Sequence, residues 1–194
     1  MGPLIVAMFL FGIGCAKNES SSSDPAEAPV TKADAPAETP EELLYGQLRS
    51  GSFQLSAAAG SIEDSLVAAQ EASKALARFR DLKDAMVEAA DFINSAGASV
   101  AEFTDEPPEK EVVDKDFAAF DEKRLSAVEA ANDALQDLRQ ALGLLESLSD
   151  DPNPEAVKWA TGVKSLVAVA LDDVWGAIEA LGGTPETAIE SPAG

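Results

Sequence analysis

The chain has 194 residues, with 14 Lys and Arg against 35 Asp and Glu, and no histidine. The net charge of −21 argues against nucleic-acid binding and against electrostatic attraction to anionic lipid. A single cysteine excludes a disulfide framework, and the lack of histidine excludes histidine-based zinc sites and serine–histidine catalysis. The length suits one domain with appendages.

The chain opens with an uncharged apolar segment, MGPLIVAMFLFGIG, directly before Cys15. Its apolar run of about ten residues is too short to span a hydrocarbon core of roughly 30 Å as a helix. That length is typical of the apolar region of a secretory signal, so residues 1–14 are predicted to be a cleaved signal peptide. The alternative is a buried N-terminal helix, which the polar sequence that follows disfavours.

The residues at this junction, Gly12-Ile13-Gly14-Cys15, resemble the lipobox of bacterial lipoproteins, in which a small residue precedes the lipid-bearing cysteine. The family more often has leucine at the position of Gly12. The resemblance implies that the signal is cut before Cys15, that the thiol carries a diacylglycerol, and that the new amine is acylated. Two or three acyl chains give a stable anchor where one chain does not.

The resemblance also implies that the protein is located in the cell envelope. Ala16 follows the cysteine, whereas inner-membrane lipoproteins tend to have aspartate at that position. An outer membrane, where one exists, is therefore the favoured location. The alternative interpretation of Cys15 is an unpaired thiol of no consequence.

The segment after the cysteine is rich in Ala, Ser, Pro and Glu, and Val30 is the only large apolar residue between positions 16 and 40. Such a composition cannot repay the entropy of ordering the chain. Residues 15–40 are therefore predicted to be a lipidated cysteine with a disordered tether. As a flexible coil, the tether would hold the following domain about 25–30 Å from its anchor.

From residue 41 to residue 181 the chain has the apolar periodicity of an all-α domain. A capping-box pattern, Thr39-Pro40-Glu41-Glu42, starts a first helix over residues 41–59. Three glycines weaken this helix. A second capping pattern at Ser61 predicts that a longer helix begins there and continues to about residue 103.

Two more helices are predicted in the second half of the domain. Pro107-Pro108 separates the second helix from a third over residues 112–149. Asn153-Pro154 has the residue types of an N-cap and a first helical position, so the last helix is predicted over residues 155–181. Gly182-Gly183 is a typical helix stop.

Short turns between long amphipathic helices imply antiparallel neighbours. Residues 41–181 are therefore predicted to form an antiparallel three- or four-helix bundle. The number depends on whether residues 41–59 fold back or merge with the second helix. Residues 182–194 are predicted to be a flexible C-terminal tail.

Two rows of acidic residues at helical spacing could supply the oxygen ligands of calcium or magnesium. They are Asp81, Asp84, Glu88 and Asp91 in one helix and Glu129, Asp133 and Asp137 in the next. At roughly 100° per residue, both rows lie opposite the apolar seam of their helix. They are predicted to face solvent, and neither a metal site nor a cofactor is expected.

The last helix has apolar residues on more than one side. The candidate face for a partner or ligand consists of Trp159, Leu166, Val169 and Trp175, with the two tryptophans flanking the main apolar stripe. Such a helix is either central in its bundle or contacted by a partner. Ordinary burial and an exposed groove for a peptide, another protomer or an apolar ligand both remain open.

The sequence contains no phosphate-binding loop, nucleophile elbow or metal-ligand motif, so catalytic residues are not predicted. These features predict a lipid-anchored cell-envelope protein whose bundle is a non-catalytic interaction or structural module. Its expected partners are the membrane, through the anchor, and another protein or a second copy of itself, but not nucleic acid. The alternative is a periplasmic module that binds a small apolar or lipid ligand between its helices.

Overall fold

The computed structural model describes residues 38–187, which form helices and turns without a β-strand. The all-α prediction is therefore confirmed for this part of the chain. The predicted signal peptide, Cys15 and the tether up to residue 37 lie outside the described residues, as do residues 188–194. The long helices are α1 (Pro40–Ala75), α2 (Arg80–Ser99), α4 (Phe117–Ser149) and α5 (Pro154–Ala180). The short ones are η1 (Ala77–Phe79), η2 (Ala101–Phe103) and α3 (Lys110–Lys115).

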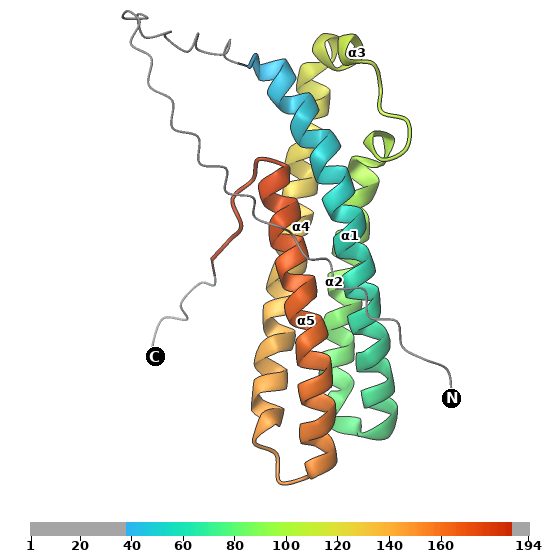
Figure 1. Ribbon diagram of the computed structural model, residues 1–194, viewed down its shortest axis with the longest axis vertical. Coiled ribbons are helices and arrows are strands. Elements are labelled where there is room, and N and C mark those ends of the chain that lie inside the picture. Colours follow the sequence, from blue (N-terminus) through green and yellow to red (C-terminus); the bar gives the residue numbers. More distant parts are fainter. Residues whose placement is uncertain (1–37, 188–194) are drawn as a thin grey trace, which may run out of the picture. The chain divides into compact units, whose positions relative to one another are not determined.

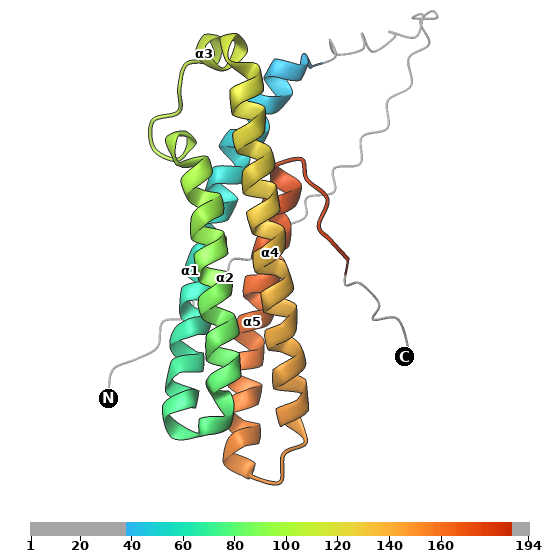
Figure 2. The same cartoon turned by 180° about the vertical axis from the view of Figure 1, so that it is seen from behind.

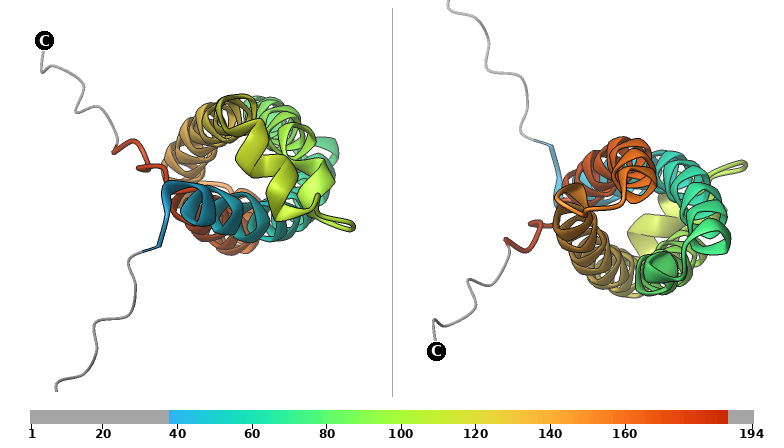
Figure 3. Two further views of the ribbon diagram at one scale, coloured as in Figure 1. Left: turned by 90° about the horizontal axis from the view of Figure 1, so that it is seen from above. Right: turned by 90° about the horizontal axis from the view of Figure 1, so that it is seen from below.

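The four long helices pack side by side as a helical bundle, and each runs opposite to the long helix before it (Figures 1 and 2). α1 contacts α2 and α5, and α4 contacts the same two helices from the other side. Viewed along the helices, the order around the ring is α1, α2, α4, α5 (Figure 3). Each helix therefore needs one broad buried face.

Apolar side chains three and four residues apart supply these buried faces. Many of them are alanines, which allow the helices to approach closely, and Gly51 marks an extreme case. A Cβ added at Gly51 of α1 would lie 2.3 Å from Cδ2 of Leu181. The largest side chains that are fully buried include Phe79, Phe103, Leu48, Leu55, Ile62, Leu82, Met86, Ile93, Leu135, Leu138, Leu145 and Ile178.

The first two predicted helices have different bounds in the structure. The expected break at Gly60 does not occur, because α1 continues through this residue to Ala75. Ser61 is not a helix cap, and its hydroxyl donates instead to the carboxylate of Asp173 on α5. The predicted long helix to residue 103 is interrupted at Leu76, which has extended backbone angles of φ −139° and ψ 118°.

The break at Leu76 has a tertiary cause. A continuous helix from Pro40 to Ser99 would be about 90 Å long, far more than the neighbouring helices could cover. The turn at η1 reverses the chain, so that α2 packs against α1. The apolar spacing continues across the turn through Ala72, Leu76 and Phe79, because both helices face the same core. This continuity explains why periodicity alone predicted one helix.

The third predicted helix, residues 112–149, is interrupted at Asp116, between α3 and α4. The capping residues of the first and last predicted helices are better matched. Thr39 and Glu42 form both hydrogen bonds of the capping box, at 3.2 and 3.1 Å. Asn153 caps α5 by accepting from the N–H of Glu155 at 3.0 Å. At the other end of α5, Gly182 has φ +71°, and the N–H of Gly183 donates to the carbonyl of Ile178. This is a Schellman stop, as the glycine pair predicted.

Candidate functional site

The four residues of the predicted α5 face lie on two sides of the helix. Trp159 and Leu166 are seven residues apart and share one side, whereas Trp175 is nine residues from Leu166 and lies about 180° away from it. Val169 is the most exposed of the four, with 53% of its surface accessible. The structure therefore does not bring the four residues together into one continuous face.

The first side of α5 adjoins α1. Asp173, seven residues after Leu166, accepts the hydrogen bond from Ser61 across this boundary. Trp159 is half-buried and packs against the core, while 37% of Leu166 is accessible. Much of this side is therefore used by the contact between α1 and α5.

The second side of α5 adjoins α4. Trp175 is half-buried, and its indole N–H donates to the Glu179 carboxylate at 3.0 Å. The guanidinium carbon of Arg139, on α4, lies 5.9 Å from the centre of a Trp175 ring. A cation stacked at this distance is attracted by the aromatic ring. Trp175 therefore has two polar neighbours and belongs to a polar site between the helices.

The chain after α5 completes that site. We refer to residues 183–187 as the strap. The Glu186 N–H donates to Oδ1 of Asn132 at 2.8 Å, and Arg139 donates to the Glu186 carbonyl. Nε2 of Gln136 donates to the Glu186 carboxylate at 2.7 Å, and Pro185 is buried. The described part of the predicted flexible tail is thus hydrogen-bonded along α4.

Asn132 is central to this arrangement because only 7% of its surface is exposed. Its Nδ2 donates to the carbonyl of Val128 at 3.1 Å, so both ends of the side-chain amide have a partner. Neither Asn132 nor the strap was predicted from the sequence. The available signal was a polar residue directly beside the apolar seam of α4, followed two turns later by Arg139.

The acidic rows differ from each other. Asp81, Asp84, Glu88 and Asp91 are all exposed on α2. In the second row, however, Asp137 is half-buried, and its Oδ2 is fully buried without a hydrogen-bond partner among the described residues. Burial raises the pKa of the Asp137 carboxyl, and the nearby charges of Glu88 and Asp133 raise the pKa further. The expectation of a solvent-facing acid was therefore wrong at Asp137.

Burial is the main cause of this difference, and Glu88 of α2, which lies near Asp137, adds to it. The helical angle of Asp137 on its own helix could not reveal that neighbour. Within residues 38–187, no group of three or more acidic or cysteine side chains is arranged to hold a metal ion. The cluster is thus a place of charge repulsion between two helices.

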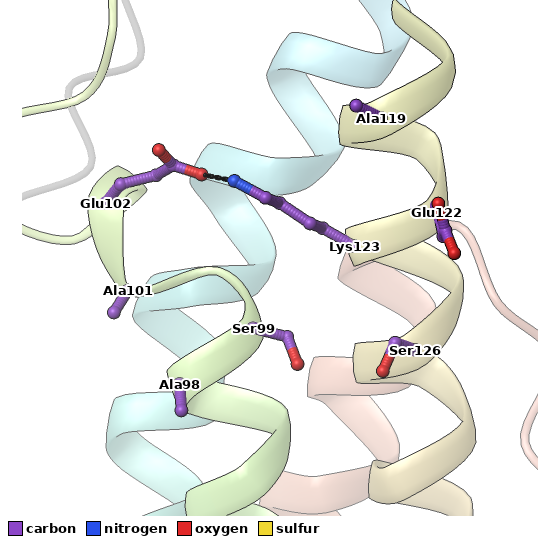
Figure 4. Close-up of a pocket in the computed structure, with 8 residues that line it drawn as sticks. All are labelled: Ala98, Ser99, Ala101, Glu102, Ala119, Glu122, Lys123 and Ser126. Carbon is purple, nitrogen blue, oxygen red and sulfur yellow. Dashed lines mark hydrogen bonds and ion pairs between the residues drawn. The ribbon is translucent and has the colours of Figure 1, made fainter.

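The groove between α2 and α4 also contains a pocket of about 630 Å³ (Figure 4). Its lining combines small residues with a few charged ones: Ala98, Ser99, Ala101, Glu102, Ala119, Glu122, Lys123 and Ser126. Lys123 extends from α4 toward Glu102 and forms an ion pair with it. Neither tryptophan lines this pocket, so it is separate from the predicted α5 face.

Ion pairs connect parts of the bundle that are far apart in the sequence. Arg78 in η1 pairs with Asp151, in the corner between α4 and α5. The N–H of Asn153 and the Arg78 guanidinium lower the pKa of the Asp151 carboxyl. At the opposite end, Lys110 pairs with Glu42 at 2.8 Å and lowers its pKa. These pairs join chain turns to neighbouring helices and form no cleft for chemistry.

Comparison with protein families, with curated proteins and with solved structures found no match. A search of the helices between residues 38 and 187 found none with the length and apolar character needed to cross a bilayer.

Proposed function

We propose that this chain is a lipid-anchored protein of the cell envelope whose helical body is a non-catalytic interaction or structural module. The observation that carries the proposal is the junction at Gly14-Cys15, where an apolar segment meets the lone cysteine of the chain. A polar stretch rich in Ala, Ser, Pro and Glu follows directly. Such a stretch would let the body stand clear of the membrane.

The proposed body is an antiparallel four-helix bundle. Its support is the ring of α1, α2, α4 and α5, in which successive long helices alternate in direction. An interaction role is supported by the site between α4 and α5, where Asn132 and Arg139 hold the main chain of an extended segment. The main chain of a peptide offers the same donor and acceptor groups, so these two side chains could bind one in the same way.

The ligand-binding alternative has less support. The two tryptophans that suggested it lie on opposite sides of α5, and both are partly buried against the core. The pocket between α2 and α4 is lined by the charged side chains of Glu102, Glu122 and Lys123, which suit an apolar ligand poorly. We therefore favour interaction with a protein over binding of an apolar ligand.

The anchor is tested by expressing the full chain in a bacterial host and separating membranes from soluble protein. We expect the natural sequence to fractionate with membranes and Cys15→Ser to be released, because serine cannot carry the thioether-linked lipid. Ser20→Ala is the matched control and should remain with the membranes. Mass spectrometry of the N-terminal peptide should show the added lipid. An unchanged distribution of Cys15→Ser would refute the anchor.

A further inference from the structure

We propose that the side of α4 carrying Asn132, Gln136 and Arg139 is a binding site for an extended peptide segment of a partner protein. In this structure the strap, residues 183–187, occupies that site in cis. The inference deepens the interaction role proposed above, but it does not depend on the lipid anchor at Cys15. Its test therefore has a separate readout.

The main chain of a single residue is bound from two sides. Asn132 and Arg139 are seven residues apart on α4, so they lie two turns apart on the same side of the helix. Asn132 accepts the Glu186 N–H at 2.8 Å, and Arg139 donates to the Glu186 carbonyl. Any extended segment has one donor and one acceptor per residue, proline excepted. This part of the site therefore recognises backbone rather than one particular side chain.

The burial of Asn132 indicates that a main-chain donor belongs here. With the strap in place, only 7% of the Asn132 surface is exposed, and its amide oxygen accepts from the strap rather than from its own helix. A buried amide oxygen without a donor is unfavourable, and an apolar residue would serve packing alone better. The position thus has the properties of a recognition residue whose partner must supply an N–H.

The remaining contacts define the chemistry of the segment. Pro185 is buried, and the Glu186 carboxylate accepts from Gln136 at 2.7 Å. Arg139 contacts the main-chain carbonyl of the same residue. The site therefore fits an extended segment in which proline precedes an acidic residue.

The strap is held on α4 by Glu186 and by the buried Pro185, and Gly183 lies close to Val128 of α4. All of the hydrogen bonds described above between the strap and α4 involve one residue, Glu186. A segment tethered next to its site has an effective concentration on the order of mM, so it blocks weak external peptides but yields to a stronger partner. Releasing the strap should therefore expose the site.

The test uses the full chain and a fluorescein-labelled peptide with the sequence of residues 182–190, GGTPETAIE. Glu186→Pro removes the N–H that Asn132 accepts and should release the strap. We expect the peptide to bind this variant at least about tenfold more tightly than the natural chain in fluorescence polarisation, because the cis competitor is gone. Adding Asn132→Ala should abolish the gain. The matched control, Thr187→Pro, keeps the Glu186 N–H and should behave like the natural chain.

Equal peptide affinity for the natural chain and Glu186→Pro would overturn the proposal, as would a gain that survives Asn132→Ala. A natural chain that is a dimer, and that Glu186→Pro converts to a monomer, would overturn occupancy in cis. Hydrogen exchange on the natural chain provides a check that needs no variant. The Glu186 amide should exchange more slowly than the Thr187 amide, and equal rates would refute the contact.

Discussion

The two flanks of α4 differ in whether their buried polar groups have hydrogen-bond partners. On the flank toward α5, the amide of Asn132 has a partner for its oxygen and another for its nitrogen. On the flank toward α2, Asp137 buries a carboxylate oxygen without a hydrogen-bond partner among the described residues, and Glu88 and Asp133 lie nearby. The flank toward α5 therefore contains a neutral amide with hydrogen-bond partners, whereas the flank toward α2 contains a carboxylate close to like charges.

The comparison shows that burial alone does not tell whether a polar residue stabilises a helix contact. A satisfied amide contributes a modest net stability and specifies what lies against it. An ionised carboxylate in a partly dehydrated site with acidic neighbours is destabilising instead. The α5 flank is therefore organised for a specific contact, and the α2 flank carries a penalty that mutation can remove.

The largest effect is expected at Asn132. Asn132→Ala should lower the free energy of unfolding by about 1–2 kcal/mol, because it removes both hydrogen bonds of a buried amide. Urea denaturation followed by circular dichroism measures this change. Asn94→Ala is the matched control, because Asn94 is exposed on α2, and it should change the value by less than about 0.5 kcal/mol. Equal effects of the two variants would show that the α5 flank gains nothing from its buried amide.

A change of opposite sign is expected at Asp137. Asp137→Asn should raise the free energy of unfolding by about 0.5–1 kcal/mol at pH 7, because it removes the cost of burying a charge and the repulsion from Glu88 and Asp133. Asp91→Asn, at an exposed position on α2, controls for the lower net charge and should give a smaller gain. A loss of stability in Asp137→Asn would mean that the carboxylate has a stabilising partner after all.

The same residue predicts a pH dependence. The folded-state pKa of Asp137 is raised above its unfolded value, so the ionised form destabilises the fold. As the pH falls from 7 through the folded-state pKa, this penalty disappears. The advantage of Asp137→Asn over the natural chain should therefore shrink on acidification and be lost below about pH 4, where the unfolded carboxyl is also protonated. A difference independent of pH would contradict this explanation.

A smaller gain is expected at Glu88, which is exposed and only one of the groups that raise the pKa of Asp137. Glu88→Gln should stabilise the protein by about 0.2–0.5 kcal/mol at pH 7. In a double-mutant cycle, the gain should largely vanish when Asp137→Asn is already present. Fully additive effects would place Glu88 outside the interaction.

The smallest effect is expected at an exposed pair. Lys83 and Asp84 on α2 form an ion pair at 2.7 Å, with 37% and 63% of their side chains accessible. Lys83→Gln should change the free energy of unfolding by less than about 0.5 kcal/mol, because solvent screens the pair. If Lys83→Gln changed the free energy of unfolding as much as Asn132→Ala, burial would not explain why the two flanks of α4 differ.

Local chemistry allowed several parts of the fold to be predicted. Thr39, Asn153 and Gly182 act at helix ends through their own side chains or backbone freedom, so their residue types carried the information. Periodicity failed at Leu76 because the apolar seam continues across the turn. It failed at Gly60 for a different reason, since a glycine weakens an isolated helix but neighbouring helices can hold it in place.

The candidate site was less predictable. Trp175 was recognised because it is large and apolar, but its position beside Arg139 requires knowledge of how α4 and α5 are placed. The sequence showed Asn132 as a polar residue beside the apolar seam, but not its partner Glu186, which lies 54 residues later in the chain. Side-chain type shows what a residue can bond to, but it does not show which group faces it.

Sequence alone determined that most of residues 41–181 are helical, where the first helix begins, where the last helix begins and ends, and which side of each helix is apolar. Those properties depend on interactions within a few residues of one another. The break at Leu76, the repulsion at Asp137 and the binding of the strap by Asn132 were decided by tertiary structure. Each of them depends on a neighbour from another helix or segment. The apolar periodicity of one helix does not show which residues of other segments contact it.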